Sequence, residues 1–149
     1  MSVRLLVIER VALLRGIEFF NAAPGHVLAA LATEATEVSL AVGDTLIRRG
    51  EHGDSLYVVA SGRMRVEVES VTIDELHPGS IAGELSMLVP EPRSATVTAV
   101  EPTVVLRVSK AIVDEFLLDH PEVARGIITT LVRRLQERNA LLARSGSVT

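Results

Sequence analysis

The sequence predicts a mainly β domain with flanking helices, folded as a β-sandwich or a barrel-like roll. Three observations predict this class. From residue 37 to 108 apolar and polar residues alternate, most cleanly over 63–69, where Met64, Val66 and Val68 share one face of a strand. Turn signals interrupt this stretch at short intervals. Before and after it, apolar residues recur with the helical period of about 3.6 residues.

Each element follows from its local pattern. Helices are expected at 5–14 and 24–33, with Pro24 in the first turn of the second, where its missing N–H is harmless. The alternating stretch divides into the candidate strands 37–41, 45–48, 55–60, 63–69, 71–76, 95–100 and 103–108. Ser109 suits the N-cap of a helix over 110–119, and Pro121 begins a long helix that reaches about Ala143.

Composition limits the classes of partner. The 149 residues suffice for one domain with a single core. With 19 acidic and 15 basic residues the net charge is −4, so no general positive field attracts nucleic acid or an anionic membrane. There is no cysteine, and the apolar stretches are too short to span a bilayer. We therefore expect a cytoplasmic protein, or the cytosolic part of a membrane protein, without a nucleic-acid partner or a membrane-inserted segment.

The segment 79–97 carries the clearest chemistry. Gly83 allows the backbone to approach a ligand, and 84–88 can form a short helix whose free N–H groups face an anion. One loop later Arg93 offers a fork of donors to phosphate oxygens, whereas Glu84 can accept a hydrogen bond from a sugar hydroxyl. Together these groups suit a ribose phosphate. The alternative is that Glu84 and Arg93 form an ion pair that stabilises a loop, with Gly83 serving only a turn.

Two motifs within the alternating stretch 37–108 occur together in a known family. One is Gly83-Glu84-Leu85, a short apolar helix, and then Pro92-Arg93-Ser94-Ala95-Thr96-Val97. The other precedes it as Gly43-Asp44, Gly50-Glu51, Gly53-Asp54-Ser55-Leu56-Tyr57-Val58-Val59 and Gly62. The first resembles the phosphate-binding cassette of cyclic-nucleotide-binding domains, which are found in catabolite-activator-type regulators, cyclic-nucleotide-dependent kinases and gated channels. The resemblance extends from about Ile17 to the last helix.

The resemblance implies an eight-stranded antiparallel β-roll, similar to a jelly roll, in a single domain over 1–149. Its parts are N-terminal helices within 1–35, a roll over 36–108 that holds the cassette at 83–95, and hinge and lid helices over 109–144. It implies a regulatory module that binds a cyclic nucleotide and passes a conformational change to an attached or partner effector. The alternative is a degenerate domain of the same fold that binds no nucleotide and serves interaction or dimerisation.

Residue roles are carried over by position. Glu84 would accept from the ribose 2′-hydroxyl, the backbone at Gly83 and Leu85 with Ser86 would cap the cyclic phosphate, and Arg93 would neutralise its charge. Ser94 and Ala95 would complete the phosphate contacts. Threonine after the arginine favours cGMP in the family, so Ser94 favours cAMP. The base would stack near Val66 under the last helix, at Leu131, Arg134 or Leu135.

Departures from the family pattern shape the remaining expectations. Ala82 stands where the family usually has an aromatic residue, which loosens the pocket floor. No helix-turn-helix follows the last helix, so we expect the chain to be part of a larger protein that holds the effector. The apolar stripe of the last helix, Ile128, Leu131, Leu135 and Leu142, either covers the roll or forms a homodimer seam.

Other chemistries are set aside. His26, His52, His77 and His120 stand singly rather than at metal-ligand spacing, so neither a metal nor another cofactor is expected. No histidine is placed in sequence to activate Ser86 or Ser94, and we expect no catalysis. The turn at 50–54 lacks the lysine of a phosphate loop. Its Gly53 is expected to supply a left-handed conformation.

Overall fold

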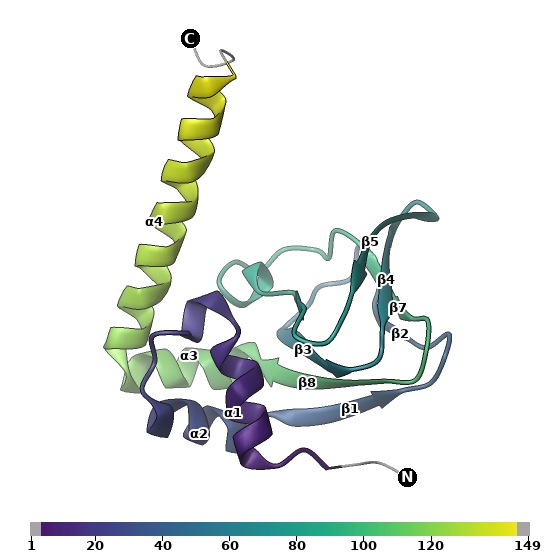
Figure 1. Ribbon diagram of the computed structural model, residues 1–149, viewed down its shortest axis with the longest axis horizontal. Coiled ribbons are helices and arrows are strands. Elements are labelled where there is room, and N and C mark those ends of the chain that lie inside the picture. Colours follow the sequence, from purple (N-terminus) through teal and green to yellow (C-terminus); the bar gives the residue numbers. More distant parts are fainter. Residues whose placement is uncertain (1–3, 146–149) are drawn as a thin grey trace.

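The computed structural model describes residues 4–145, and it places helices at one end of a β-roll (Figure 1). The roll consists of two four-stranded antiparallel sheets, ordered β1-β8-β3-β6 and β2-β7-β4-β5. The eight strands within the described residues are β1 Thr36–Leu40, β2 Thr45–Ile47, β3 Ser55–Ser61, β4 Met64–Val68, β5 Val71–Leu76, β6 Ile81–Ala82, β7 Thr96–Ala99 and β8 Thr103–Ser109. The predicted eight-stranded roll with flanking helices is confirmed.

One strand, β6, was not predicted from the local pattern. It has only two residues, and it pairs through Ile81 with Val58 and through Ala82 with Tyr57 of β3. A two-residue strand is too short for an alternating pattern to reveal it, and the glycines at 79 and 83 on either side predict a loop. The pairing matters because it leads the chain from β5 across to the other sheet, directly into the cassette.

The helices are α1 Val7–Arg15, η1 Glu18–Phe20, α2 Gly25–Glu34, η2 Leu85–Met87, α3 Lys110–Asp119 and α4 Pro121–Arg144, where η denotes a 3₁₀ helix. Pro24 is the N-cap of α2 rather than a residue of its first turn. Ser109 caps α3 as predicted, its hydroxyl accepting from the Ile112 amide at 3.3 Å. The Arg10 guanidinium donates to the carbonyls of Ala32 and Ala35, which ties α1 to the C-terminal end of α2.

Two hydrophobic clusters divide the interior. One fills the space between the two sheets and consists of Ile47, Val59, Met64, Leu76, Val97, Ala99 and Val105. The other joins the helices to the first sheet through residues such as Phe20, Leu28, Leu56, Leu106 and Val123. Helices η1 and α4 pack against each other at the helical end. The cassette lies between the roll and the helices, since Met87 of η2 is buried in the helical cluster.

Helix α4 extends beyond the rest of the molecule (Figure 1). Its first turns are packed, since Val123 and Ile127 are buried, but Ile128, Leu135 and Leu142 are exposed by 62%, 58% and 38%. These three residues therefore do not cover the roll, whereas Leu131 is half-buried against the helical cluster. Among residues 4–145 no helix is both long and apolar enough to cross a membrane.

Candidate functional site

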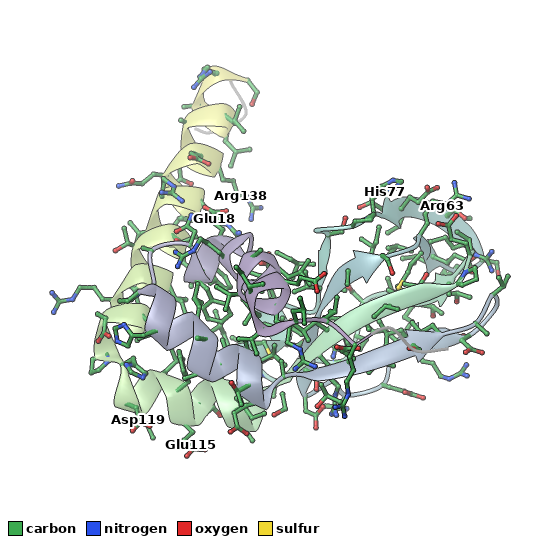
Figure 2. All side chains as sticks on the ribbon, turned by 60° about the horizontal axis from the view of Figure 1, so that its bottom comes forward. Glu18, Arg63, His77, Glu115, Asp119 and Arg138 are labelled. Atoms are coloured by element: carbon green, nitrogen blue, oxygen red, sulfur yellow. The ribbon has the colours of Figure 1, made fainter. Side chains whose placement is uncertain are left out.

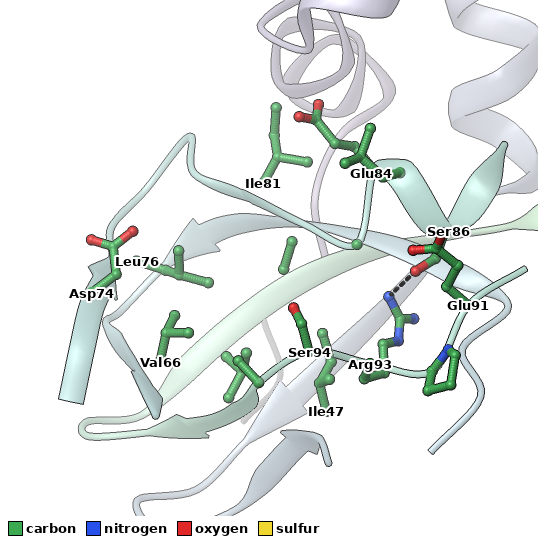
Figure 3. Close-up of a pocket in the computed structure, with 16 residues that line it drawn as sticks. Ile47, Val66, Asp74, Leu76, Ile81, Glu84, Ser86, Glu91, Arg93 and Ser94 are labelled. Carbon is green, nitrogen blue, oxygen red and sulfur yellow. Dashed lines mark hydrogen bonds between the residues drawn. The ribbon is translucent and has the colours of Figure 1, made fainter. Parts of the chain in front are cut away.

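A pocket of about 380 Å³ opens in the β-roll, and the cassette forms one side of it (Figure 3). This volume lies in the range of small-molecule sites, about 300–1,000 Å³. Residues from both sheets line the remaining walls. All seven predicted ligand-binding residues and the predicted base contact line the pocket: Gly83, Glu84, Leu85, Ser86, Arg93, Ser94, Ala95 and Val66.

Arg93 is the buried cation of the pocket, with 8% of its surface exposed. One terminal nitrogen, Nη2, donates to the Ser55 carbonyl at 2.7 Å, and Nη1 donates to the Ser86 hydroxyl at 3.3 Å. Its backbone is fixed as well, because the Arg93 amide donates to the Glu51 carbonyl and the Gly50 amide donates to the Arg93 carbonyl, both at 2.8 Å. Within residues 4–145 no carboxylate forms an ion pair with Arg93.

The Arg93 side chain occupies space that is free only because residues 53 and 83 are glycines. A Cβ on Gly53 would overlap its guanidinium, and a Cβ on Gly83 would meet Nη1 and approach the Ser55 carbonyl to 2.8 Å. Gly83 also has φ 81°, which favours glycine. The expected left-handed conformation of Gly53 is wrong, since Gly53 is not among the residues with positive φ. Gly53 is required instead because the arginine passes where a side chain would lie.

Glu84 pairs with the last helix and not with Arg93. Its Oε1 accepts a hydrogen bond from Nη1 of Arg134 at 3.3 Å, and this ion pair joins the cassette to α4. The alternative that Glu84 and Arg93 form a loop-stabilising ion pair is therefore wrong for this structure. The pairing leaves Glu84 on the pocket wall, within reach of both a ligand and the helix.

Arg134 belongs to a cluster of charges at the helical end. Its Nη2 donates to Glu18 of η1 at 2.9 Å, and its guanidinium lies 5.0 Å from the centre of the Phe19 ring. Arg133 also bonds to Glu18, which lies beside α4 (Figure 2). Hydrogen bonds from Arg134 and Arg133 lower the pKa of Glu18 below its ordinary 4.5, and the hydrogen bond with Glu18 raises the pKa of Arg134.

The short cassette helix is smaller than expected. It is a single 3₁₀ turn, Leu85–Met87, instead of a helix over 84–88. Met87 anchors it in the core, and Leu85 and Val89 are exposed by 58% and 53%. Met87 therefore fixes the turn to the core, whereas Leu85 and the following Val89 face solvent.

None of the three predicted lid residues lines the pocket. Leu131 and Leu135 do not line it, and Arg134 reaches the cassette only through Glu84. The lid role of Leu131 and Leu135 stays a prediction. Sequence reasoning also missed residues that the structure assigns to the site: Gly53, which leaves space for Arg93, Ser55, whose carbonyl accepts from it, and Asp74, Leu76 and Ile81, which line the pocket. The alternation of β5 gave no signal for Asp74, because it predicts Val71 and Ile73 on the inner face, whereas these residues are exposed by 62% and 60%.

None of the four histidines lines the pocket, although His52 contacts Pro92, which does. His77 is at the end of the roll far from the helices (Figure 2), and His52 forms an isolated bridge with Pro92. In the part of the chain that the structure describes, no group of three or more His, Asp or Glu side chains could hold a metal ion.

The family model described as "Cyclic nucleotide-binding domain" matches residues 37–120, more than half of the chain. The chain is 34% identical over 126 residues to the Pycsar effector protein XpPycTIR of Xanthomonas perforans, covering 78% of this chain but 42% of that protein. It is 25% identical over 142 residues to a CRP-like cAMP-activated global transcriptional regulator of Mycobacterium tuberculosis, of which it spans 61%. The chain thus spans about half the length of these two relatives.

A solved structure has the same architecture. The N-terminal domain of a transcriptional regulator from Streptomyces coelicolor A3(2) superposes with a TM-score of 0.81 and 33% identity, over 87% of this chain and 94% of that one.

Proposed function

Because the chain belongs to the cyclic nucleotide-binding domain family, we propose that it binds a cyclic nucleotide, cAMP in preference to cGMP, and transmits a conformational change to an effector. One observation carries the proposal: Arg93 is buried in the pocket and has no anionic partner among residues 4–145. A buried charge without a counter-ion is costly. The phosphate of a cyclic nucleotide is the anion that this site lacks.

The other roles follow from the order of groups along the pocket. The phosphate lies against Arg93, Ser86 and Ser94, with the backbone at Gly83, Leu85 and Ala95 close by. Glu84 accepts a hydrogen bond from the ribose 2′-hydroxyl. Serine rather than threonine after Arg93 favours adenine over guanine.

Transmission of the signal passes through Glu84. Its carboxylate is shared between the pocket wall and Arg134 of α4. A ribose hydroxyl bound to Glu84 competes with Arg134, so ligand binding shifts the equilibrium between arrangements of α4 relative to the roll. The effector lies in a larger protein or a partner, the domain turns over no substrate, and we propose the cytoplasm as its location.

Helix α4 is the proposed route to that effector. Its exposed stripe, Ile128, Leu135 and Leu142, recurs every seven residues, as one position of the heptad repeat of a coiled coil does. We therefore propose a homodimer through α4. The exposure of these residues in the single chain supports it.

Calorimetric titration of cAMP and cGMP tests the binding proposal. Arg93→Ala should weaken cAMP binding at least about 30-fold, because removing one partner of a buried charge pair typically costs about 2–5 kcal/mol. Arg49→Ala is the matched control, since Arg49 pairs with the exposed Glu69 and does not line the pocket. Absence of heat with either nucleotide, from a wild type shown to be folded by circular dichroism, would favour the degenerate interaction module instead.

A further inference from the structure

Asp74 lies at the end of the pocket opposite to Arg93. It belongs to β5, where it pairs with Val66 of β4, and both residues line the pocket. Figure 3 shows Arg93 and Ser86 at one end, Asp74 at the other, and Glu84 between them along the upper rim. Apolar side chains of Val66, Leu76 and Ile81 surround the Asp74 end.

The Asp74 carboxylate has unused capacity to accept hydrogen bonds. Its Oδ1 accepts from the Glu75 amide at 2.8 Å, and within residues 4–145 the side chain forms no ion pair. Glu84, in contrast, is engaged by Arg134. β5 is an edge strand and Asp74 is exposed to solvent, and the oxygens of a carboxylate side chain accept hydrogen bonds.

We propose that Asp74 selects the base of the bound nucleotide by accepting a hydrogen bond from an amino group on the edge farthest from the sugar. This inference rests on the proposed function. With the phosphate at Arg93 and the ribose at Glu84, only the base is left for the far end of the pocket. The apolar walls there suit the flat faces of a base, and Asp74 is the charged group that meets its edge.

The chemistry at that edge distinguishes nucleotides. Adenine carries an amino group at its 6-position and cytosine one at its 4-position, whereas hypoxanthine, guanine and uracil carry a carbonyl oxygen there. A carboxylate aligned with this exocyclic position attracts the amino group and repels the oxygen, whereas the ring N–H of hypoxanthine, guanine and uracil lies at the next position along the edge. Asp74 therefore favours cAMP over cIMP, two ligands that differ only at this edge, and it favours cCMP over cUMP in the same way.

Calorimetry with cAMP and cIMP on the wild type, Asp74→Asn and Glu75→Gln tests this role. The wild type should prefer cAMP by about tenfold, the size of one charge-assisted hydrogen bond. In Asp74→Asn the ratio should fall below about twofold, because an amide can donate to the 6-oxygen as well as accept. Glu75→Gln removes the neighbouring charge, which pairs with Arg63 outside the pocket, and should keep the wild-type ratio.

The outcomes separate the two proposals. If wild-type protein binds neither cAMP, cGMP nor cIMP, the proposed function fails, and this inference with it. If the wild type binds cAMP but Asp74→Asn keeps the wild-type ratio of cAMP to cIMP affinity, the base-reading role is overturned and nucleotide binding stands. If Asp74→Asn weakens the binding of cAMP and cIMP equally, the affinity ratio is unchanged, and this result also overturns the base-reading role.

Discussion

Two arginines meet at the cassette, Arg93 as one of its own residues and Arg134 from α4, and they differ in how they are held. Arg93 is buried, its backbone and guanidinium are both hydrogen-bonded, and two glycines leave its space. Arg134 is half-exposed and is held by ion pairs with Glu18 and Glu84. The first is preorganised for an anion, whereas the second makes contacts that a ligand can exchange. Under the proposed function, anion binding would therefore rest on Arg93 and transmission to α4 on Arg134.

Among changes that leave both arginines in place or remove Arg134, the largest effect is expected from filling the space of Arg93. Gly83→Ala should displace the guanidinium, weaken cAMP binding at least tenfold and destabilise the fold by more than the roughly 1–2 kcal/mol of left-handed strain. Gly79→Ala is the control, because Gly79 has a similar φ of 91° but a Cβ there would meet no atom of residues 4–145 within 4 Å. Thermal unfolding and calorimetry of both variants measure the difference. Equal losses would mean that contact with Arg93 is unimportant.

A smaller effect of opposite sign is expected at the second arginine. Arg134→Ala frees Glu84 for the ribose, so cAMP affinity should rise, by up to about fivefold for an ion pair at the surface. Arg133→Ala should leave the affinity unchanged, since Arg133 contacts Glu18 but not Glu84. Titration of the two variants side by side compares them. A loss of affinity in Arg134→Ala would show that this arginine assists binding and does not compete with it.

The smallest effect is a pH dependence of the Glu18 contacts. The pKa of Glu18 is lowered in the folded protein, so its stabilising contribution is fully present above the ordinary value of 4.5 and is lost as pH falls through the lower folded pKa. The stability difference between wild type and Glu18→Gln should therefore shrink on acidification. Thermal unfolding of both proteins at pH values above and below 4.5 measures this difference in stability. A difference that is constant with pH would contradict the assignment.

Local sequence patterns predicted the secondary structure of this molecule better than the side-chain contacts between residues far apart in the chain. The roll, the cap at Ser109 and the position of Arg93 in a ligand pocket follow from short stretches of sequence. β6 was missed because its two residues carry no period. The Glu84–Arg134 pair joins residues 50 apart in the chain, and Gly53 is explained only by the path of Arg93 in space. Neither relation is visible in a local pattern.

The length of α4 turns a small local change into a large displacement. Its 24 residues rise about 36 Å at about 1.5 Å per residue, and only the first turns are buried against the core. A tilt of about 10° at Pro121 would therefore move the far end by about 6 Å. Under the proposed function, exchange of a single ion pair at Arg134 would be an ångström-scale event, and the length of the helix would enlarge it at the far end.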